Sequence, residues 1–248
     1  MGLVTLLTDY NNKDFYLAKV ESRAKRLFPS LNLLHIAHLL PNFKFEQAAF
    51  NFNAMLDEFQ ADDLHFIFLN HHGDSLNKLI IAQTQNEGVV ISADNGLLGL
   101  LNCEFTNFYQ LPIPRGSFPE LEILQLVKDY QDDLSQLEIV KPKLFRPVLP
   151  VVTDKELKGQ VIYVDGYGNC IVNIREDQFK EFTVGNSYHI KMRREIVERI
   201  DVDYSNASEA GLSLFFNEQG YLEISMVYGN ASKLLGLTIN SIISVKKN

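Results

Sequence analysis

The sequence contains no tryptophan and only two cysteines, Cys103 and Cys170. Neither cysteine belongs to a Cys-x-x-Cys motif, so the pattern of a disulfide framework or of a cysteine-based zinc site is missing. With 248 residues, the chain is long enough to bury a large core without disulfides or a metal ion. Any aromatic surface for a ligand must come from the 17 phenylalanines and 10 tyrosines.

Basic residues are also in deficit, because 23 Lys and Arg face 31 Asp and Glu, a net charge of −8. This balance argues against a nucleic-acid binder, whose affinity comes largely from neutralising phosphates. No apolar run approaches the ~18 residues of a membrane span, and no basic segment precedes Asp9 as it would in a signal peptide. We therefore expect a cytoplasmic protein that contacts neither nucleic acid nor membrane. The acidic surplus weakly favours a cationic or zwitterionic small ligand over a polyanion, but the preferred interpretation is that a net charge of this size simply keeps the protein soluble.

The apolar pattern divides the chain in two. Up to about residue 150, short apolar runs alternate with helical patterns, expected at residues 14–27, 45–59 and 119–130. This alternation predicts an α/β domain with a largely parallel central sheet. After a proline-bearing stretch at 142–150, short strands separated by glycine-marked turns predict a smaller all-β domain, like a barrel or a sandwich. The predicted domains are therefore residues 1–150 and 151–248.

Two carboxylates follow predicted strands of the first domain: Asp9 follows the run at 3–7, and Asp94 follows the run at 89–92. Ligands of α/β proteins bind at the carboxyl ends of parallel strands, and a carboxylate there can accept hydrogen bonds from both hydroxyls of a ribose. The alternative for each residue is a structural role, capping a turn or the following helix. No Gly-x-Gly-x-x-Gly motif follows the first strand, which argues against a pyrophosphate loop.

The remaining candidates are histidines, His35 and His38 near the second strand and the adjacent pair His71 and His72. Neighbouring residues of an extended chain point to opposite sides, so His71 and His72 cannot chelate one ion together. The spacing of His35 and His38 also differs from the helical spacing of zinc enzymes. We therefore predict no metal site. A histidine at a strand end could act as a general base near neutral pH, or it could simply bond to the backbone.

Six short motifs lie in a fixed order along nearly the whole chain. They are Leu7-Thr8-Asp9-Tyr10, His38 to Pro41 with Gln47-Ala48-Ala49, Asp94-Asn95-Gly96-Leu97-Leu98, Asp165-Gly166-Tyr167-Gly168-Asn169 with Val172-Asn173-Ile174, Gly220 to Ile224, and Gly229 to Gly236. Together they resemble the motifs of the S-adenosyl-L-methionine (SAM) hydroxide adenosyltransferases, or SAM hydrolases. These enzymes are relatives of the SAM-dependent fluorinase and chlorinase.

The resemblance implies an α/β domain followed by a β-barrel domain. It also implies a homotrimer in which SAM lies between the first domain of one subunit and the second domain of its neighbour. In this family water attacks the ribose C5′ and methionine leaves, giving adenosine. Because the sulfonium is already a good leaving group, the protein mainly has to align one water with the C5′–S bond and exclude other solvent. SAM is then the substrate or ligand, and no cofactor is implied.

The resemblance also implies roles for individual side chains. Asp9 would bind the ribose diol, Asp165 the methionine ammonium group and Asn169 the edge of the adenine. Tyr10 and Tyr167 would enclose the adenosine, in place of the family's phenylalanines. The full expected ligand-binding set is Asp9, Tyr10, Asp94, Asn95, Asp165, Tyr167, Asn169 and Glu218.

Departures from the family pattern fall on the hydrolytic residues. Where the family has an aspartate and an arginine after its third strand, this chain has Asn70 and either Asn77 or, with a slip of one residue, Lys78. The family's later histidine has no counterpart in the segment Pro114 to Phe118. Where the methionine carboxylate meets a serine in the family, this chain has Glu218, which would repel it. A neutral amide cannot replace a carboxylate base, so the family's hydrolytic apparatus is incomplete here.

Two hypotheses remain open. In the first, the chain is a divergent SAM hydrolase in which His71 or His72 replaces the lost base, and the expected catalytic positions are Asn70, His71, His72 and Lys78. In the second, it is a non-catalytic descendant that binds SAM, adenosine or a related nucleoside, as a sensor or as a structural trimer. A halogenating role is a third option, for which the sequence offers no recognisable halide pocket.

Overall fold

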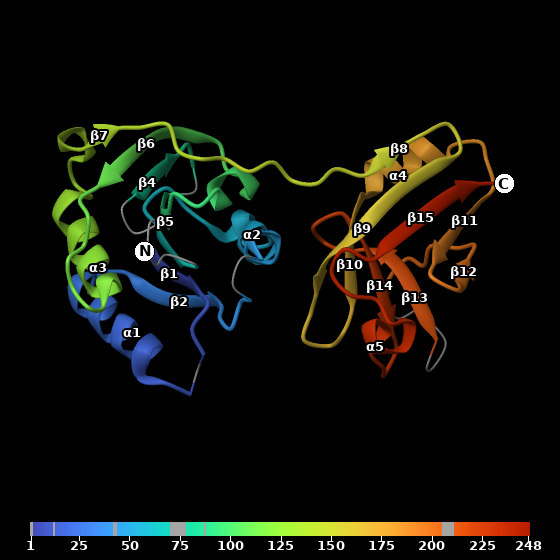
Figure 1. Ribbon diagram of the computed structural model, residues 1–248, viewed down its shortest axis with the longest axis horizontal. Coiled ribbons are helices and arrows are strands. Elements are labelled where there is room, and N and C mark those ends of the chain that lie inside the picture. The colour runs from blue at the N-terminus through green and yellow to red at the C-terminus, as the bar shows by residue number, and fades with distance from the viewer. Residues whose placement is uncertain (1, 12, 42–43, 70–77, 87, 205–210) are drawn as a thin grey trace. The chain divides into compact units, whose positions relative to one another are not determined.

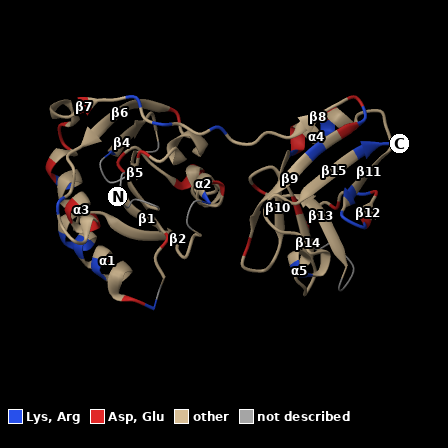
Figure 2. Cartoon of the chain, viewed as in Figure 1, with Lys and Arg blue, Asp and Glu red and all other residues tan. Residues whose placement is uncertain are grey.

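The computed structural model of the chain describes residues 2–11, 13–41, 44–69, 78–86, 88–204 and 211–248 (Figure 1). The chain forms two compact units, Met1–Pro147 and Val148–Asn248. Lys, Arg, Asp and Glu are interspersed along both units (Figure 2). Within the described ranges, no helix has both the length and the apolar character needed to span a membrane.

In the described part of the first unit, a seven-stranded sheet forms the centre. Its strands are, in spatial order, β2 (Asn32–Ala37), β1 (Leu3–Thr8), β3 (Leu64–Phe68), β5 (Val89–Ala93), β4 (Leu79–Thr84), β6 (Phe105–Leu111) and β7 (Glu138–Ile139). The pairings from β2 to β5 are parallel, whereas those from β5 through β4 and β6 to β7 are antiparallel. The sheet is therefore mixed, and the prediction of a largely parallel sheet is corrected.

The connection between β4 and β5 explains the change of direction. Only residues 85–88 join the two strands. Parallel neighbours need a crossover of a dozen residues or more, so such a short connection can only join antiparallel strands. The two apolar runs are visible in the sequence, but the runs themselves carry no information on strand direction.

Helices cover both faces of this sheet (Figure 1). On one face, Val20 and Ile123 from two helices pack in a core with Phe66. On the other face, Phe52 packs in a second core with Ile67. Phe66 and Ile67 belong to opposite cores because successive strand residues point to opposite faces. The helices are α1 (Phe15–Leu27), α2 (Phe45–Asn53) and α3 (Pro119–Tyr130), with short 3-10 segments at Leu56–Glu58, Leu97–Leu100 and Leu134–Gln136.

The second unit contains, in its described residues, an eight-stranded antiparallel sheet. Its strands are, in spatial order, β12 (Glu195–Val197), β11 (Tyr188–Met192), β15 (Ile242–Lys247), β9 (Glu156–Val164), β10 (Cys170–Arg175), β14 (Tyr221–Met226) and β13 (Leu212–Phe216), with β8 (Val151–Val152) beside β9. The first half of β9 pairs with β15 and its second half with β10, so the sheet curls into a half barrel. Gly159 lies in the middle of β9, where a Cβ would come within 2.6 Å of the Ile174 side chain.

Among the described residues of this unit, two helices correct the expectation of an all-β domain. They are α4 (Glu176–Thr183) and α5 (Ala231–Leu235). Phe179 and Phe182 of α4 are buried in the core of the unit, and their spacing of three residues places them on one face of a helix. Both helices are shorter than the ten or so residues over which a helical period becomes recognisable among short strands.

Candidate functional site

The carboxyl end of β1 carries Asp9, where the parallel strands β1 and β3 end side by side. The Asp9 N–H donates to the carbonyl of Phe68, the last residue of β3 (3.2 Å), and the Asp9 side chain is partly buried. In the turn before α1, Asn11 Oδ1 accepts hydrogen bonds from the N–H groups of Lys13 and Asp14 (2.8 and 3.1 Å). Asn11 therefore closes the turn that leads into the helix.

The segment 38–40 holds the Asp9 turn from a second side. The Leu39 N–H donates to the Tyr10 carbonyl (2.8 Å), and the Leu40 N–H donates to the Thr8 carbonyl (3.4 Å). Leu39 has φ of 60°, a left-handed conformation that leucine rarely adopts, and its side chain is 61% exposed. Backbone strain of this kind costs about 1–3 kcal/mol and clusters at functional sites. Asp9 therefore stands in a backbone frame with little freedom.

His38 connects this frame to the protein surface. Its Nδ1 shares a hydrogen bond with Thr8 Oγ1 and its Nε2 shares one with His35 Nδ1, both at 2.8 Å. His35 Nε2 lies 3.8 Å from a carboxylate oxygen of Glu21. Burial, followed by the neighbouring His35, lowers the pKa of His38 to about 4, so its imidazole is neutral near pH 7. Across the described ranges, His, Cys, Asp and Glu side chains do not gather in threes that could hold a metal ion.

Tyr10 is bonded to a buried carboxylate that the sequence analysis missed. Its hydroxyl donates a hydrogen bond to Glu120 Oε1, and Glu120 is only 1% exposed. Burial, followed by the hydrogen bond and the charge of Glu120 and then by the charge of Asp9, raises the pKa of Tyr10. The sequence did show a glutamate directly after Pro119, which begins α3. Acidic residues in the first turn of a helix are also common on protein surfaces, so this position alone did not indicate a buried carboxylate. Tyr10, Asp9 and Glu120 thus form one electrostatically connected group.

Asp94 and Asn95 bond to the backbone of neighbouring loops. Asp94 Oδ1 accepts a hydrogen bond from the Lys143 N–H (2.6 Å). Asn95 Nδ2 donates to the carbonyl of Leu69 (3.0 Å), which follows β3, and Asn95 Oδ1 accepts from the Leu97 N–H (3.1 Å). Asp94 thus holds a segment far along the chain, whereas Asn95 binds the first N–H of the short 3-10 segment that follows, and both residues lie at the same edge of the sheet as Asp9.

The expected hydrolytic positions are covered only in part. Asn70, His71 and His72 lie outside the described residues. Lys78 directly precedes β4, its side chain is exposed, and its carbonyl accepts a hydrogen bond from the Asp94 N–H (2.7 Å). Lys78 therefore lies next to Asp94, at the end of β5.

In the second unit, Asp165 organises the turn between β9 and β10. Its Oδ1 accepts hydrogen bonds from the N–H groups of Tyr167 (2.9 Å) and Asn169 (2.8 Å). Its Oδ2 accepts from the Asn169 side-chain amide (2.9 Å). Gly168 takes φ of 89° in this turn, and the Tyr167 side chain is 82% exposed. The structure thus brings Asp165, Tyr167 and Asn169 together as one preformed group, in which the Tyr167 ring is exposed and the other two residues are partly buried.

Glu218 lies far from this turn along the same pair of strands. In the β10–β14 pairing, Cys170 stands opposite Ile224 and Arg175 stands opposite Tyr221. Asp165 precedes the first end, and Glu218 precedes the other end. The six residues of β10 span about 17–20 Å, so Glu218 and Asp165 cannot contact the carboxylate and the ammonium group of one amino acid.

A second missed residue, Glu223 on β14, lies nearer to Asp165. Its two carboxylate oxygens accept hydrogen bonds from Ser225 Oγ (2.9 Å) and Asn217 Nδ2 (3.2 Å). Burial is the main cause that raises the pKa of Glu223, and the charge of Asp165 raises it further. The sequence pattern places Glu223 on the opposite side of β14 from the buried Leu222 and Ile224. Such alternation also describes an ordinary surface residue of a strand.

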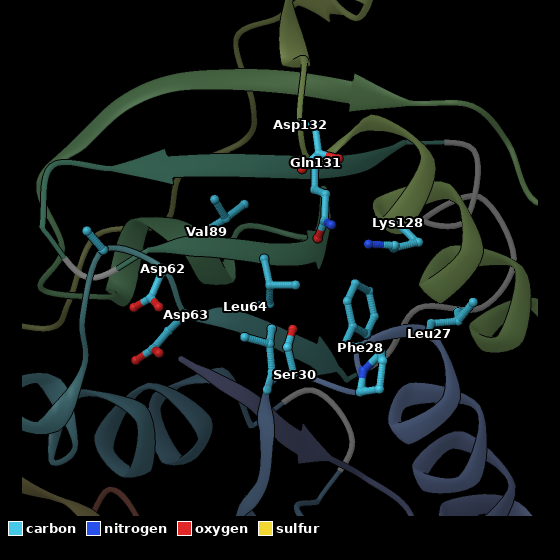
Figure 3. A pocket seen from close by; sticks show the side chains of 13 residues that line it. Leu27, Phe28, Ser30, Asp62, Asp63, Leu64, Val89, Lys128, Gln131 and Asp132 are labelled. Atoms are coloured by element: carbon cyan, nitrogen blue, oxygen red, sulfur yellow. The ribbon is translucent and has the colours of Figure 1, made fainter. Parts of the chain in front are cut away.

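A cavity of about 470 Å³ opens at the opposite edge of the first unit's sheet (Figure 3). Leu64 and Val89, the first residues of β3 and β5, line it, whereas Asp9 and Asp94 follow the last residues of their strands. Asp63 lies at this cavity, but its carboxylate oxygens accept hydrogen bonds from the N–H groups of Leu3 (2.6 Å) and Gln60 (2.8 Å). The carboxylate of Asp63 therefore already binds two backbone N–H groups of the chain itself.

Comparisons with known proteins agree on one family. The SAM hydroxide adenosyltransferase N-terminal domain matches residues 4–120, and the C-terminal domain of the same family matches residues 159–244. An (R)-S-adenosyl-L-methionine hydrolase from Methanocaldococcus jannaschii is 22% identical over an alignment of 252 positions. The alignment covers 96% of this chain and 93% of that protein.

Two solved structures have the same fold. An uncharacterized conserved protein from Thermotoga maritima superposes with a TM-score of 0.87 at 21% identity, covering 98% of this chain and 100% of that chain. A conserved hypothetical protein from Thermus thermophilus superposes with a TM-score of 0.75 at 20% identity, covering 100% of both chains. Both similarities extend over the two units of the chain.

Proposed function

The chain belongs to the SAM hydroxide adenosyltransferase family, and from this premise we propose that it binds SAM and hydrolyses it to adenosine and methionine. The observation that carries the proposal is the frame around Asp9. A partly buried carboxylate stands at the carboxyl ends of two parallel strands, the usual ligand edge of such sheets. Hydrogen bonds from Asp9 itself and from the segment 38–40 support the backbone of this turn. Asp9 then accepts hydrogen bonds from the two ribose hydroxyls.

The reaction needs little from the protein beyond alignment. Water attacks C5′, the C5′–S bond breaks with its electron pair going to sulfur, and methionine leaves as a neutral thioether. One proton is lost from the attacking water. A side chain that holds this water in line and accepts the proton increases the rate.

We assign the acceptance of that proton to His71 or His72. Asn70 stands where the family has an aspartate, and an amide has no proton affinity near neutral pH. Lys78 takes the place of the family's arginine in one of the two alignments and lies at the same edge of the sheet as Asp94. These roles are part of the proposal.

The remaining assignments concern the ligand's other parts. Tyr10 and Tyr167 enclose the adenosine, Asn169 binds the adenine edge and Asp165 binds the methionine ammonium group. The protein acts as a cytoplasmic homotrimer, in which neighbouring subunits share each SAM, without a cofactor. The preformed turn at 165–169 supports these roles because it presents an exposed aromatic ring beside a carboxylate and an amide.

Incubation of the purified protein with SAM tests the proposal, with adenosine and methionine measured by chromatography against the spontaneous rate. Equal amounts of both products above that rate are expected. Asp9→Asn should reduce the rate at least tenfold, whereas the exposed Asp14→Asn should not. A His71→Ala/His72→Ala double variant should lose activity and retain SAM binding. Absence of adenosine formation, or an unchanged rate in the double variant, would contradict the hydrolytic role.

The asparagine at position 70 favours a second candidate function. If the base has been lost altogether, the chain binds SAM, adenosine or a related nucleoside without turnover. Calorimetry with SAM, adenosine and methionine then shows saturable heat from at least one of them, while chromatography shows no product. The absence of heat from all three would leave only a structural role for the trimer.

A further inference from the structure

Glu120 is a buried carboxylate that the proposed reaction does not yet use. It is the second residue of α3 and is almost fully inaccessible to solvent. The Tyr10 hydroxyl donates to its Oε1, and the Tyr10 N–H donates to Thr8 Oγ1 (3.2 Å). A single residue therefore links the carboxylate to the turn that carries Asp9, although Tyr10 and Glu120 are 110 residues apart in sequence.

Packing alone does not require a carboxylate at this position. Its neighbours on α3, Ile123 and Leu124, belong to the apolar core of the first unit. Burying an ionised carboxylate costs several kcal/mol. Replacing buried charged partners by apolar side chains of similar volume often leaves a protein as stable or makes it more stable. The first turn of α3 favours the ionised form, because a helix N-terminus carries a partial positive charge. Buried titratable groups beside a ligand edge cluster at functional sites, which makes Glu120 a candidate for a functional role.

On the basis of the proposed function, we infer that Glu120 is ionised and is a specificity-determining residue that selects the sulfonium of SAM over neutral adenosine ligands. A fixed negative charge behind Tyr10 attracts a positive charge bound near Asp9, and it has no such effect on a thioether. At an effective dielectric constant of about 20, two unit charges roughly 10 Å apart attract each other enough for about a tenfold change in affinity. The product adenosine, being neutral, gains nothing from this charge and is released more readily.

The charge of Glu120 is expected to lower KM for SAM without increasing kcat. The sulfonium loses its positive charge as the C5′–S bond breaks, so Glu120 stabilises bound SAM more than it stabilises the transition state. Removing the charge should therefore raise KM for SAM and leave kcat unchanged or higher. A residue that only positioned Tyr10 would instead lower kcat or weaken every adenosine ligand alike.

Glu120→Gln separates charge from shape, because the amide oxygen can still accept the hydrogen bond from Tyr10. Calorimetry on the full chain should show SAM binding weakened about tenfold, with binding of S-adenosyl-L-homocysteine and adenosine changed less than twofold. Glu120→Asp, which keeps the charge, should retain most of the preference for SAM. Equal weakening of all three ligands, or no change in any, overturns the inference.

Two further measurements keep the test decisive if Glu120→Gln fails to fold. The unaltered protein must bind SAM at least tenfold more tightly than S-adenosyl-L-homocysteine, and Tyr10→Phe, which keeps the carboxylate, must keep that preference. The absence of either result overturns the inference. If the unaltered protein binds neither SAM nor adenosine, the proposed function itself fails. If it binds SAM and the preference is independent of Glu120, only the specificity role fails.

Discussion

The hydroxyl of Thr8 lies 2.8 Å from Nδ1 of His38, thirty residues further along the chain. Thr8 is the last residue of β1, and His38 follows the last residue of β2, so this bond joins the ends of two parallel neighbours. Asp9 comes directly after Thr8. The position of the proposed ribose-binding carboxylate therefore depends on a neutral, partly buried imidazole.

Acid should weaken the fold through His38. Its pKa is about 4 in the folded chain and about 6.5 in an unfolded one. Between these values the unfolded chain binds a proton that the folded chain does not, so the free energy of unfolding falls as the pH drops from 6.5 to 4. The slope from this residue cannot exceed about 1.4 kcal/mol per pH unit, because the two states differ by at most one proton on His38.

Urea unfolding of the unaltered protein and of His38→Gln, at several pH values between 4.5 and 7, measures this effect. His38→Gln should show the flatter dependence on pH. His189→Gln, in the second unit, is the matched control and should follow the unaltered protein. Parallel curves for all three proteins would exclude His38 as the source of acid sensitivity.

Gly96 should tolerate no side chain. It takes φ of 100°, and a Cβ at this position would lie 2.7 Å from the ring of Phe145. Gly96→Ala should therefore reduce the free energy of unfolding by about 2–4 kcal/mol, from backbone strain and steric overlap together. Gly116→Ala, in the same unit, meets its nearest heavy atom at 3.8 Å and should change stability by less than about 0.5 kcal/mol. Chemical denaturation of both variants checks the contrast, and equal losses would contradict it.

Asp9→Asn should weaken binding without unfolding the protein. An amide can accept only one of the two hydrogen bonds that a ribose diol offers to a carboxylate, so adenosine should bind at least tenfold more weakly. Calorimetry with adenosine measures the affinity, and the thermal midpoint of unfolding serves as the control for folding. Unchanged affinity would remove Asp9 from the ligand site, whereas Asp14→Asn should leave the affinity for adenosine unaltered.

Asp165 should matter for stability as well as for ligands. Its carboxylate accepts three hydrogen bonds within the turn at 165–169, and Asp165→Ala removes them all. At roughly 0.5–1.5 kcal/mol for each bond, the free energy of unfolding should fall by about 2–4 kcal/mol. Asp154→Ala is the exposed control and should have little effect. A loss below about 0.5 kcal/mol for Asp165→Ala would show that the turn forms without its carboxylate.

Much of the architecture could be predicted from local pattern. The helices at 15–27 and 119–130 match their apolar periodicity closely, because each has several turns of buried positions. The second helix ends at Asn53, six residues before its predicted end, since the following segment turns into a short 3-10 helix. The two helices of the second unit, α4 and α5, were missed because they are too short to show a helical period. The direction of β4 was missed because an apolar run by itself does not encode strand direction.

By itself, the sequence determined the family and the edge of the sheet at which Asp9 lies. Motif order and strand-end position are local properties, and both can be read from consecutive residues. Only the tertiary structure decided that Tyr10 meets Glu120 and that Glu218 lies at the far end of β14 from Asp165. Such contacts depend on which strands pair, in which direction and in which register, and that choice is made by the packing of the whole unit.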